Sequence, residues 1–147
     1  MEVDSPKIHI EPVLLPDFER AIRREWIVAN GLGGYASSTI LGVNTRKYHG
    51  LLVSAFNPPT DRRVLLTKLD EEIEIENKTY SLGSNEFRSE IYPKGYRFLS
   101  SFALEPFPTY RYSMNGVQLR KTVFMPHGKS VTIVVYKVYN STSGEVL

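Results

Sequence analysis

Residues 26–54, WIVANGLGGYASSTILGVNTRKYHGLLVS, place short apolar runs between turns built from glycine and asparagine. The first run breaks at Asn30-Gly31. Residues 35–41 follow as a second run, and residues 51–53 form a third. Short apolar runs bounded by such turns are typical of β-strands, so this segment predicts three strands.

The polar residues of this segment gather in its turns. Residues 45–49, TRKYH, bring basic, aromatic and imidazole groups together ahead of the third run. Glycine lets the backbone approach a neighbour closely, and loops of this composition commonly carry function. We therefore interpret residues 30–35 and 46–49 as one ligand-facing surface. This requires residues 42–46 to fold back along a strand about 20 Å long, so that Tyr35 and His49 lie close together.

Strand signals continue towards the C-terminus. Residues 63–69 form another apolar run. Residues 72–76, EIEIE, alternate strictly, which predicts a strand with Ile73 and Ile75 buried and the glutamates exposed. The following pair, Asn77-Lys78, is expected to form a tight turn.

The clearest hairpin spans residues 110–125 and turns at Asn115-Gly116, a pair suited to the positive φ angles of a type I′ loop. This register places Arg111 opposite Arg120, and like charges directly opposite each other destabilise a sheet. We therefore predict a glutamate or aspartate of a neighbouring strand, or a partner segment, within salt-bridge distance of one arginine.

Both alternating faces of residues 131–139 are apolar, which predicts a strand buried on two sides. Residues 145–147 resemble the first step of a further strand, so we expect a fragment of a longer protein. Many short strands with at most one helix predict an all-β fold, an antiparallel β-sandwich. We assign residues 1–25 to an N-terminal extension with a short helix capped by Asp17, and residues 26–147 to a sandwich domain truncated at its C-terminal end.

Composition narrows the classes of function. The 147 residues suit one domain, and 41% hydrophobic with 23% charged residues is ordinary for a globular protein. A net charge of +2, scattered along the chain, does not predict nucleic-acid binding. Without cysteine, and with three histidines far apart, we expect no metal site. The N-terminus lacks a signal peptide and no run is long enough to span a membrane, so we predict a cytoplasmic protein without membrane contact.

Two sequence patterns suggest a cofactor site or a catalytic site, but neither has the geometry that such a site needs. Gly31-x-Gly33-x-x-Ala36 matches a dinucleotide fingerprint, but this motif must open a helix and the residues after it favour a strand, so we expect no cofactor. Glu72 and Glu74 lie about 7 Å apart along a strand, within the separation that glycosidases use. One row of carboxylates cannot flank a glycosidic bond from two sides, so a solvated strand face explains these glutamates better.

His49 leaves two interpretations open. It could act as a general base or contact a ligand, with Arg46 and Tyr48 beside it in sequence. No serine or cysteine nucleophile stands at a recognisable spacing, and no carboxylate is nearby in sequence to orient the imidazole. Alternatively, Tyr48 and His49 only support the start of a strand by packing and one hydrogen bond. The aromatic residues between Tyr92 and Tyr112 could stack on sugar rings, but a sandwich core needs most of them first.

Four segments carry a resemblance to a known family: EWIVANGLGGYASSTILGVNTRKYHGLLVSAFNPP, VLLTKLDEEI, YPKGYRFL and LRKTVFMPHG. With them the chain resembles the N-terminal domain of bacterial and archaeal-type glycogen debranching enzymes, the amylo-α-1,6-glucosidase family of glycoside hydrolases. The resemblance implies a supersandwich-like β-sandwich that precedes an (α/α)6 barrel. In such enzymes of glycogen catabolism, the barrel carries the acid and base that hydrolyse α-1,6-glucosidic branches.

This sequence lacks the barrel, so no catalytic residue is carried over. The resemblance implies a non-catalytic domain of carbohydrate metabolism that packs against the missing C-terminal catalytic barrel and helps to shape the site for an α-glucan, glycogen or limit dextrin. The alternative is a free-standing carbohydrate-binding or assembly module without catalysis. The substrate-binding residues expected on this basis are Asn30, Tyr35, Arg46, Lys47, Tyr48 and His49.

Overall fold

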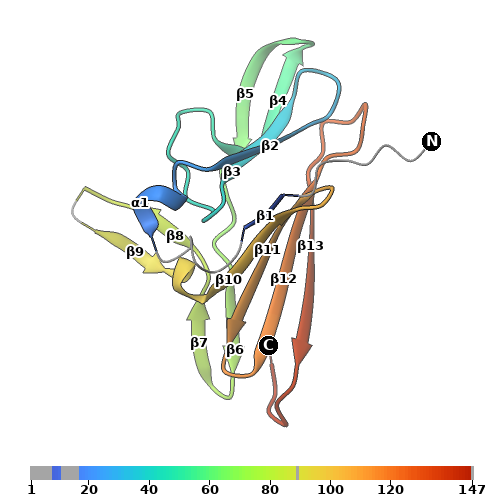
Figure 1. The fold of residues 1–147 in the computed structure, drawn as a ribbon. Coiled ribbons are helices and arrows are strands. Elements are labelled where there is room, and N and C mark those ends of the chain that lie inside the picture. Colours follow the sequence, from blue (N-terminus) through green and yellow to red (C-terminus); the bar gives the residue numbers. More distant parts are fainter. Residues whose placement is uncertain (1–7, 11–16, 89, 147) are drawn as a thin grey trace.

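The computed structural model describes residues 8–10, 17–88 and 90–146, which form an all-β sandwich as predicted. In Figure 1 a four-stranded antiparallel sheet lies at the top and a five-stranded antiparallel sheet at the lower right. The four-stranded sheet has the order β2 (Glu25–Ala29), β3 (Tyr35–Thr39), β4 (Gly50–Asn57), β5 (Thr60–Leu66). The five-stranded sheet has the order β1 (Ile8–Ile10), β10 (Leu99–Leu104), β11 (Pro108–Met114), β12 (Val117–Phe124), β13 (Ile133–Asn140).

Two hairpins and two short helices complete the described fold. The first hairpin joins β6 (Glu72–Ile75) to β7 (Lys78–Ser81), and the second joins β8 (Ser84–Glu86) to β9 (Ile91–Lys94). A 3₁₀ helix spans Gly95–Phe98 and leads into β10.

The N-terminal helix α1 spans Phe18–Ala21, and the side chain of Asp17 caps it by accepting a hydrogen bond from the Arg20 amide. The short helix and its cap are therefore as predicted. The helix ends at Ala21 because the chain joins the four-stranded sheet soon afterwards: the Arg24 carbonyl accepts from the Ile40 amide, and β2 begins at the next residue.

The hairpin of β11 and β12 has the predicted register. Met114 pairs with Val117 across the turn, where Asn115 and Gly116 have φ angles of 45° and 76°. Two positive φ angles are what a type I′ turn requires, so the Asn-Gly pair determines how the strands align.

Arg111 also pairs with Arg120 as predicted, but the expectation of an acid on a neighbouring described strand is wrong, and the alternative of a partner segment stays a prediction. Among the described residues, no carboxylate forms an ion pair with either guanidinium. Register explains this: the positions beside them in the sheet belong to Ser101 and Lys137. Instead, Arg120 donates a hydrogen bond to the hydroxyl of Tyr139 at 3.1 Å.

The prediction for the last long strand is wrong. β13 lies at the edge of the five-stranded sheet, pairs with β12 alone among the described strands, and is exposed from Val135 onward. Apolar residues on both faces show that a strand could be buried on both sides. They do not show whether another element covers either side. Val146, in the segment predicted to begin another strand, forms an antiparallel bridge with Ile75.

The other strand predictions differ from the structure at their ends. Ile73 and Ile75 are buried as predicted, but the turn after β6 lies at Glu76 and Asn77, with φ angles of 50° and 62°, one residue early. β5 begins before the predicted run and ends at Leu66, because the chain then leaves the sheet towards β6.

A buried aromatic group joins the two sheets. The indole N–H of Trp26 donates to the hydroxyl of Tyr110 at 2.5 Å, and this hydroxyl donates to the Thr39 carbonyl at 2.8 Å. The rings of Trp26 and Tyr110 meet edge to face, with centroids 6.5 Å apart. Burial raises the pKa of Tyr110 well above its usual range, so the hydroxyl stays neutral and available as a donor.

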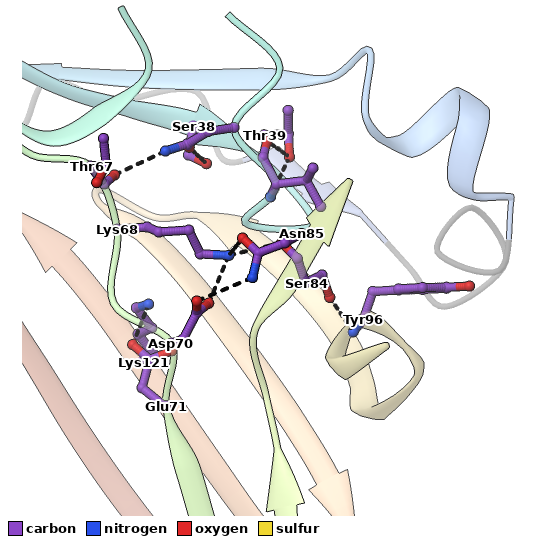
Figure 2. Close-up of polar contacts among 12 residues, drawn as sticks. Ser38, Thr39, Thr67, Lys68, Asp70, Glu71, Ser84, Asn85, Tyr96 and Lys121 are labelled. Atoms are coloured by element: carbon purple, nitrogen blue, oxygen red, sulfur yellow. Dashed lines mark hydrogen bonds and ion pairs between the residues drawn. The ribbon is translucent and has the colours of Figure 1, made fainter. Parts of the chain in front are cut away.

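Hydrogen bonds from a charged pair attach the chain after β5 to β8. In Figure 2, the Lys68 ammonium lies 2.8 Å from the Asp70 carboxylate and also donates to the Ser84 carbonyl and the Asn85 side chain. Burial would raise the pKa of Asp70, but the hydrogen bonds from Lys68 and Asn85 outweigh it and hold that pKa below its usual value. The chain after β5 is thus joined to β8 by hydrogen bonds that Lys68 and Asp70 make with Ser84 and Asn85.

Candidate functional site

An open pocket of about 510 Å³ lies against β2 and β3, on the side covered by the loop that precedes β4. Five of the six substrate-binding residues predicted from the sequence line it, and Asn30 does not. The remaining lining residues come from the two strands. The lining residues are Glu25, Trp26, Ile27, Tyr35, Ser37, Arg46, Lys47, Tyr48 and His49.

Strand register creates this pocket. Ser37, in the middle of β3, pairs with Gly50 at the start of β4, so residues 40–49 leave the end of β3 and return alongside it. The Tyr35 hydroxyl donates to the Tyr48 carbonyl at 3.2 Å. The predicted return of the chain is therefore confirmed, and Tyr35 and His49 line one pocket.

Hydrogen bonds hold the returning loop in place. The Thr39 hydroxyl both donates to the Val43 carbonyl at 2.9 Å and accepts from the Val43 amide at 3.1 Å. The Asn44 side chain contacts the Ser38 hydroxyl at 2.8 Å and donates to the Thr67 carbonyl at 2.9 Å. These side chains form hydrogen bonds with backbone groups that no strand partner satisfies, and the loop therefore holds residues 45–49 in a defined position.

Glu25 is the one acidic side chain in the pocket lining. Its carboxylate lies 2.5 Å from the Arg46 guanidinium and 3.6 Å from Nε2 of His49. Sequence reasoning missed this residue, because it lies more than twenty positions before its partners. The only signal in the sequence is that Glu25 directly precedes the apolar run that begins at Trp26. If that run and residues 35–41 form a hairpin, Glu25 lies at the end of residues 35–41, where the next loop begins.

His49 is buried, with 5% of its surface exposed. Its Nδ1 accepts a hydrogen bond from the Thr45 amide at 3.1 Å, so the neutral ring carries its proton on Nε2, which points to Glu25. Burial lowers the pKa of His49, Arg46 lowers it further, and Glu25 opposes both. Because His49 is buried, with Nδ1 accepting from the Thr45 amide and Nε2 facing Glu25, the structure favours the supporting interpretation of His49 over that of a general base.

A sequence model of the family described as glycogen debranching enzyme N terminal matches residues 24–147. The chain belongs to this family. The match includes every residue that lines the pocket and begins one position before Glu25. Searches of curated proteins and of solved structures found no match.

In this debranching enzyme N-terminal domain, Asn30 supports a loop and is completely buried. Its side-chain oxygen accepts from the amides of Leu32 at 2.9 Å and Gly34 at 3.0 Å, and its amide group donates to the Lys129 carbonyl at 3.2 Å. It therefore fastens the β2–β3 loop to the turn before β13. A direct contact with substrate is not part of its role in this geometry.

The glycines of that loop allow close packing. Gly31 and Gly33 have φ angles of 78° and 87°, which other residues rarely adopt. A Cβ at Gly31 would collide with the His127 ring, and one at Gly33 would lie 2.7 Å from Cα of Pro59. The glycine loop is thus enclosed between two other turns, and of the predicted surface only Tyr35 and residues 46–49 line the pocket.

Tyr48 has the most exposed aromatic ring in the pocket lining. Half of it is exposed (51%), and Lys47 places its ammonium 5.4 Å from the centre of the ring. Ile27, which pairs with Ser37 across β2 and β3, is exposed beside them. The pocket therefore combines an accessible aromatic ring with polar and charged groups, and with an apolar strand surface.

Neither a metal site nor a membrane helix is found in the described residues. Residues 8–10, 17–88 and 90–146 contain no cluster of three or more histidines and carboxylates arranged to hold an ion. No helix in the same ranges has the length and apolar character needed to cross a membrane.

The lowered pKa of His49 predicts a dependence of stability on pH. Between the folded pKa and the unfolded value near 6.5, the unfolded chain binds more protons at this histidine than the folded chain does. The contribution of His49 to the free energy of unfolding is therefore complete above about pH 6.5 and is lost as the pH falls below it. We expect the free energy of unfolding to decrease less from about pH 7.5 to about pH 5.5 in His49→Gln than in the wild type. Urea titrations at both pH values measure this, and an equal decrease in both proteins contradicts it.

Proposed function

We propose that the pocket binds a glucosyl segment of an α-glucan, and that the chain acts as the non-catalytic N-terminal domain of a cytoplasmic glycogen debranching glycosidase. The observation that carries the proposal is the exposed Tyr48 ring beside the Glu25–Arg46 ion pair in an open pocket. Aromatic faces suit the apolar faces of sugars, while fixed charged groups suit their hydroxyls. Membership of the debranching enzyme family supports glycogen as the source of the glucan.

A non-catalytic role agrees with the carboxylates of the pocket. Hydrolysis of a glycosidic bond uses two carboxyl groups on either side of it. Glu25 is the single carboxylate of the lining, and Arg46 and His49 already engage it. In the proposal, hydrolysis of the α-1,6 branch belongs to a separate barrel, and this domain helps to shape the glucan site.

The isolated chain is therefore expected not to hydrolyse glycogen limit dextrin. Glucose release is measured against a sample without protein and against Glu25→Gln. Release that exceeds the blank and is lost in Glu25→Gln would show catalysis by this pocket, and would contradict the proposal.

The binding proposal predicts an effect of Tyr48→Ala. We expect glycogen to retard this variant less than the wild type in affinity electrophoresis, with a dissociation constant about tenfold higher, equivalent to about 1.4 kcal/mol. Tyr139→Ala is the matched control, since Tyr139 is also 51% exposed but lies on β13. Equal retardation of both variants, or none of the wild type, contradicts a glucan site at the pocket.

A further inference from the structure

The Glu25–Arg46 ion pair uses only part of the hydrogen-bonding capacity of its two side chains. Arg46 donates from Nε to Oε1 of Glu25 at 2.5 Å, and Nε2 of His49 lies 3.6 Å from the same oxygen. Among the residues that the structure describes, none forms a hydrogen bond with Oε2 of Glu25 or with a terminal nitrogen of Arg46. Oε2 shares its carbon atom with Oε1, and the terminal nitrogens share theirs with Nε. The pocket lining therefore presents a carboxylate acceptor and guanidinium donors side by side.

The strand and the loop both hold this pair in place. Glu25 is the first residue of β2 and pairs with Thr39 at the end of β3, so the sheet sets its position. In the loop, the His49 amide donates to the Arg46 carbonyl at 3.0 Å, and the ring of His49 is buried. The side chains of Glu25 and Arg46 remain 30% and 69% exposed, so a ligand can reach them. Groups that are fixed before a ligand arrives lose less freedom on binding, which favours affinity.

The opposite charges of the pair indicate which ligand chemistry it suits. An anionic ligand that approaches Arg46 also meets the negative charge of Glu25, which repels it. A hydroxyl group is both a donor and an acceptor. Two adjacent hydroxyls can therefore satisfy the pair together, with one donating to Oε2 and the other accepting from Arg46. Such bonds to ionised groups are about twice as strong as bonds between neutral groups.

Tyr48 adds an aromatic ring to the same side of the site. It follows Arg46 by two positions in the loop, lines the same pocket and is half exposed. Its carbonyl accepts from the Tyr35 hydroxyl, which joins this part of the loop to β3. A glucosyl unit in an α-1,4-linked chain has an apolar ring face, and its hydroxyls at C2 and C3 are free and adjacent. The ring and the ion pair together match these two features.

We propose that the Glu25–Arg46 pair recognises the adjacent C2 and C3 hydroxyls of an α-1,4-linked glucosyl unit, with one hydroxyl donating to Glu25 and the other accepting from Arg46. This inference rests on the glucan binding proposed for the pocket, and it names the atoms that make this binding selective. Glu25 determines the specificity, because it is the single carboxylate of the lining. Methylation of the two hydroxyls removes their protons, so the unit can no longer donate to Glu25.

Isothermal titration calorimetry of the whole chain with two methylated amyloses tests this proposal. Amylose methylated at O6 retains the C2 and C3 hydroxyls, whereas amylose methylated at O2 and O3 lacks them, and both keep the rings and linkages. We expect the wild type to bind the O6-methylated amylose about tenfold more tightly. In Glu25→Gln this affinity should fall about tenfold, and the preference between the two amyloses should disappear. Asp61→Asn removes the charge of an exposed ion pair with Arg63 on β5, outside the pocket lining, and should retain both the affinity and the preference.

The selectivity and the glucan site fail in distinguishable ways. If Glu25→Gln weakens the binding of both amyloses equally, Glu25 only supports the loop, and its recognition of hydroxyls is wrong. Equal affinity of the wild type for both amyloses also overturns the selectivity, while a loss of maltohexaose binding in Tyr48→Ala would leave the glucan site standing. If the wild type binds no maltohexaose up to about 1 mM, both are wrong. Arg46→Gln is an independent variant of the pair, and its preference between the amyloses should also decrease.

Discussion

Replacing Glu71 with alanine is expected to lower the free energy of unfolding by about 3–5 kcal/mol. Its carboxylate lies 2.5 Å from the Lys121 ammonium, and the two side chains are only 15% and 10% exposed (Figure 2). The Tyr136 hydroxyl donates to the same oxygen at 2.5 Å. Removing the carboxylate leaves a buried ammonium without its counter-ion, and a buried charge costs far more than an exposed one.

Urea unfolding followed by the fluorescence of Trp26, the single and buried tryptophan, measures this loss. Glu72→Ala is the neighbouring control, and its exposed side chain should contribute less than about 0.5 kcal/mol. The double variant Glu71→Leu with Lys121→Met should recover most of the stability, since it removes both charges together. A loss in Glu71→Ala no larger than that of the control contradicts the interpretation of a buried ion pair.

Asn30→Ala is expected to lower the free energy of unfolding by about 2–4 kcal/mol, because each buried group left without a partner costs about 1–3 kcal/mol. The substitution removes hydrogen bonds to Leu32, Gly34 and Lys129 at a position with no exposed surface. Water cannot replace these bonds without opening the loop. The same loss would separate the β2–β3 loop from the turn before β13.

Thermal and urea unfolding of Asn30→Ala give the comparison, with Asn57→Ala as the control. Asn57 is exposed at the end of β4, and its backbone carbonyl accepts a hydrogen bond from the Thr60 hydroxyl, which the substitution leaves in place. Its replacement should change stability by less than about 0.5 kcal/mol. If Asn30→Ala unfolds like the control but loses affinity for glycogen, Asn30 is a substrate contact and the structural role is wrong.

Features set by local chemistry were predictable from the sequence. The Asn115-Gly116 pair determines the turn type, and the turn type determines that Arg111 faces Arg120. Strict alternation in β6 likewise shows which side chains are buried, because successive side chains of a strand point to opposite faces.

Features set by distant contacts were not predictable in the same way. Glu25 meets His49 only because a register between β3 and β4 brings the returning loop over β2. The exposure of β13 depends on what packs beside it, and an apolar pattern contains no such information. The glycines at Gly31 and Gly33 indicate that the backbone needs unusual freedom, but the reason, packing against His127 and Pro59, appears only in the fold.

Hydrogen–deuterium exchange with and without maltohexaose tests most directly whether the pocket binds glucan. We predict slower exchange at the amides of residues 45–50, which form the loop before β4, and at Ile27 of β2 beside it. Exchange in β13 should not change, because that strand lies in the other sheet. Protection confined to β13 or to the glycine loop, or no protection of residues 45–50 at a concentration of maltohexaose that saturates binding, would contradict a glucan site in this pocket.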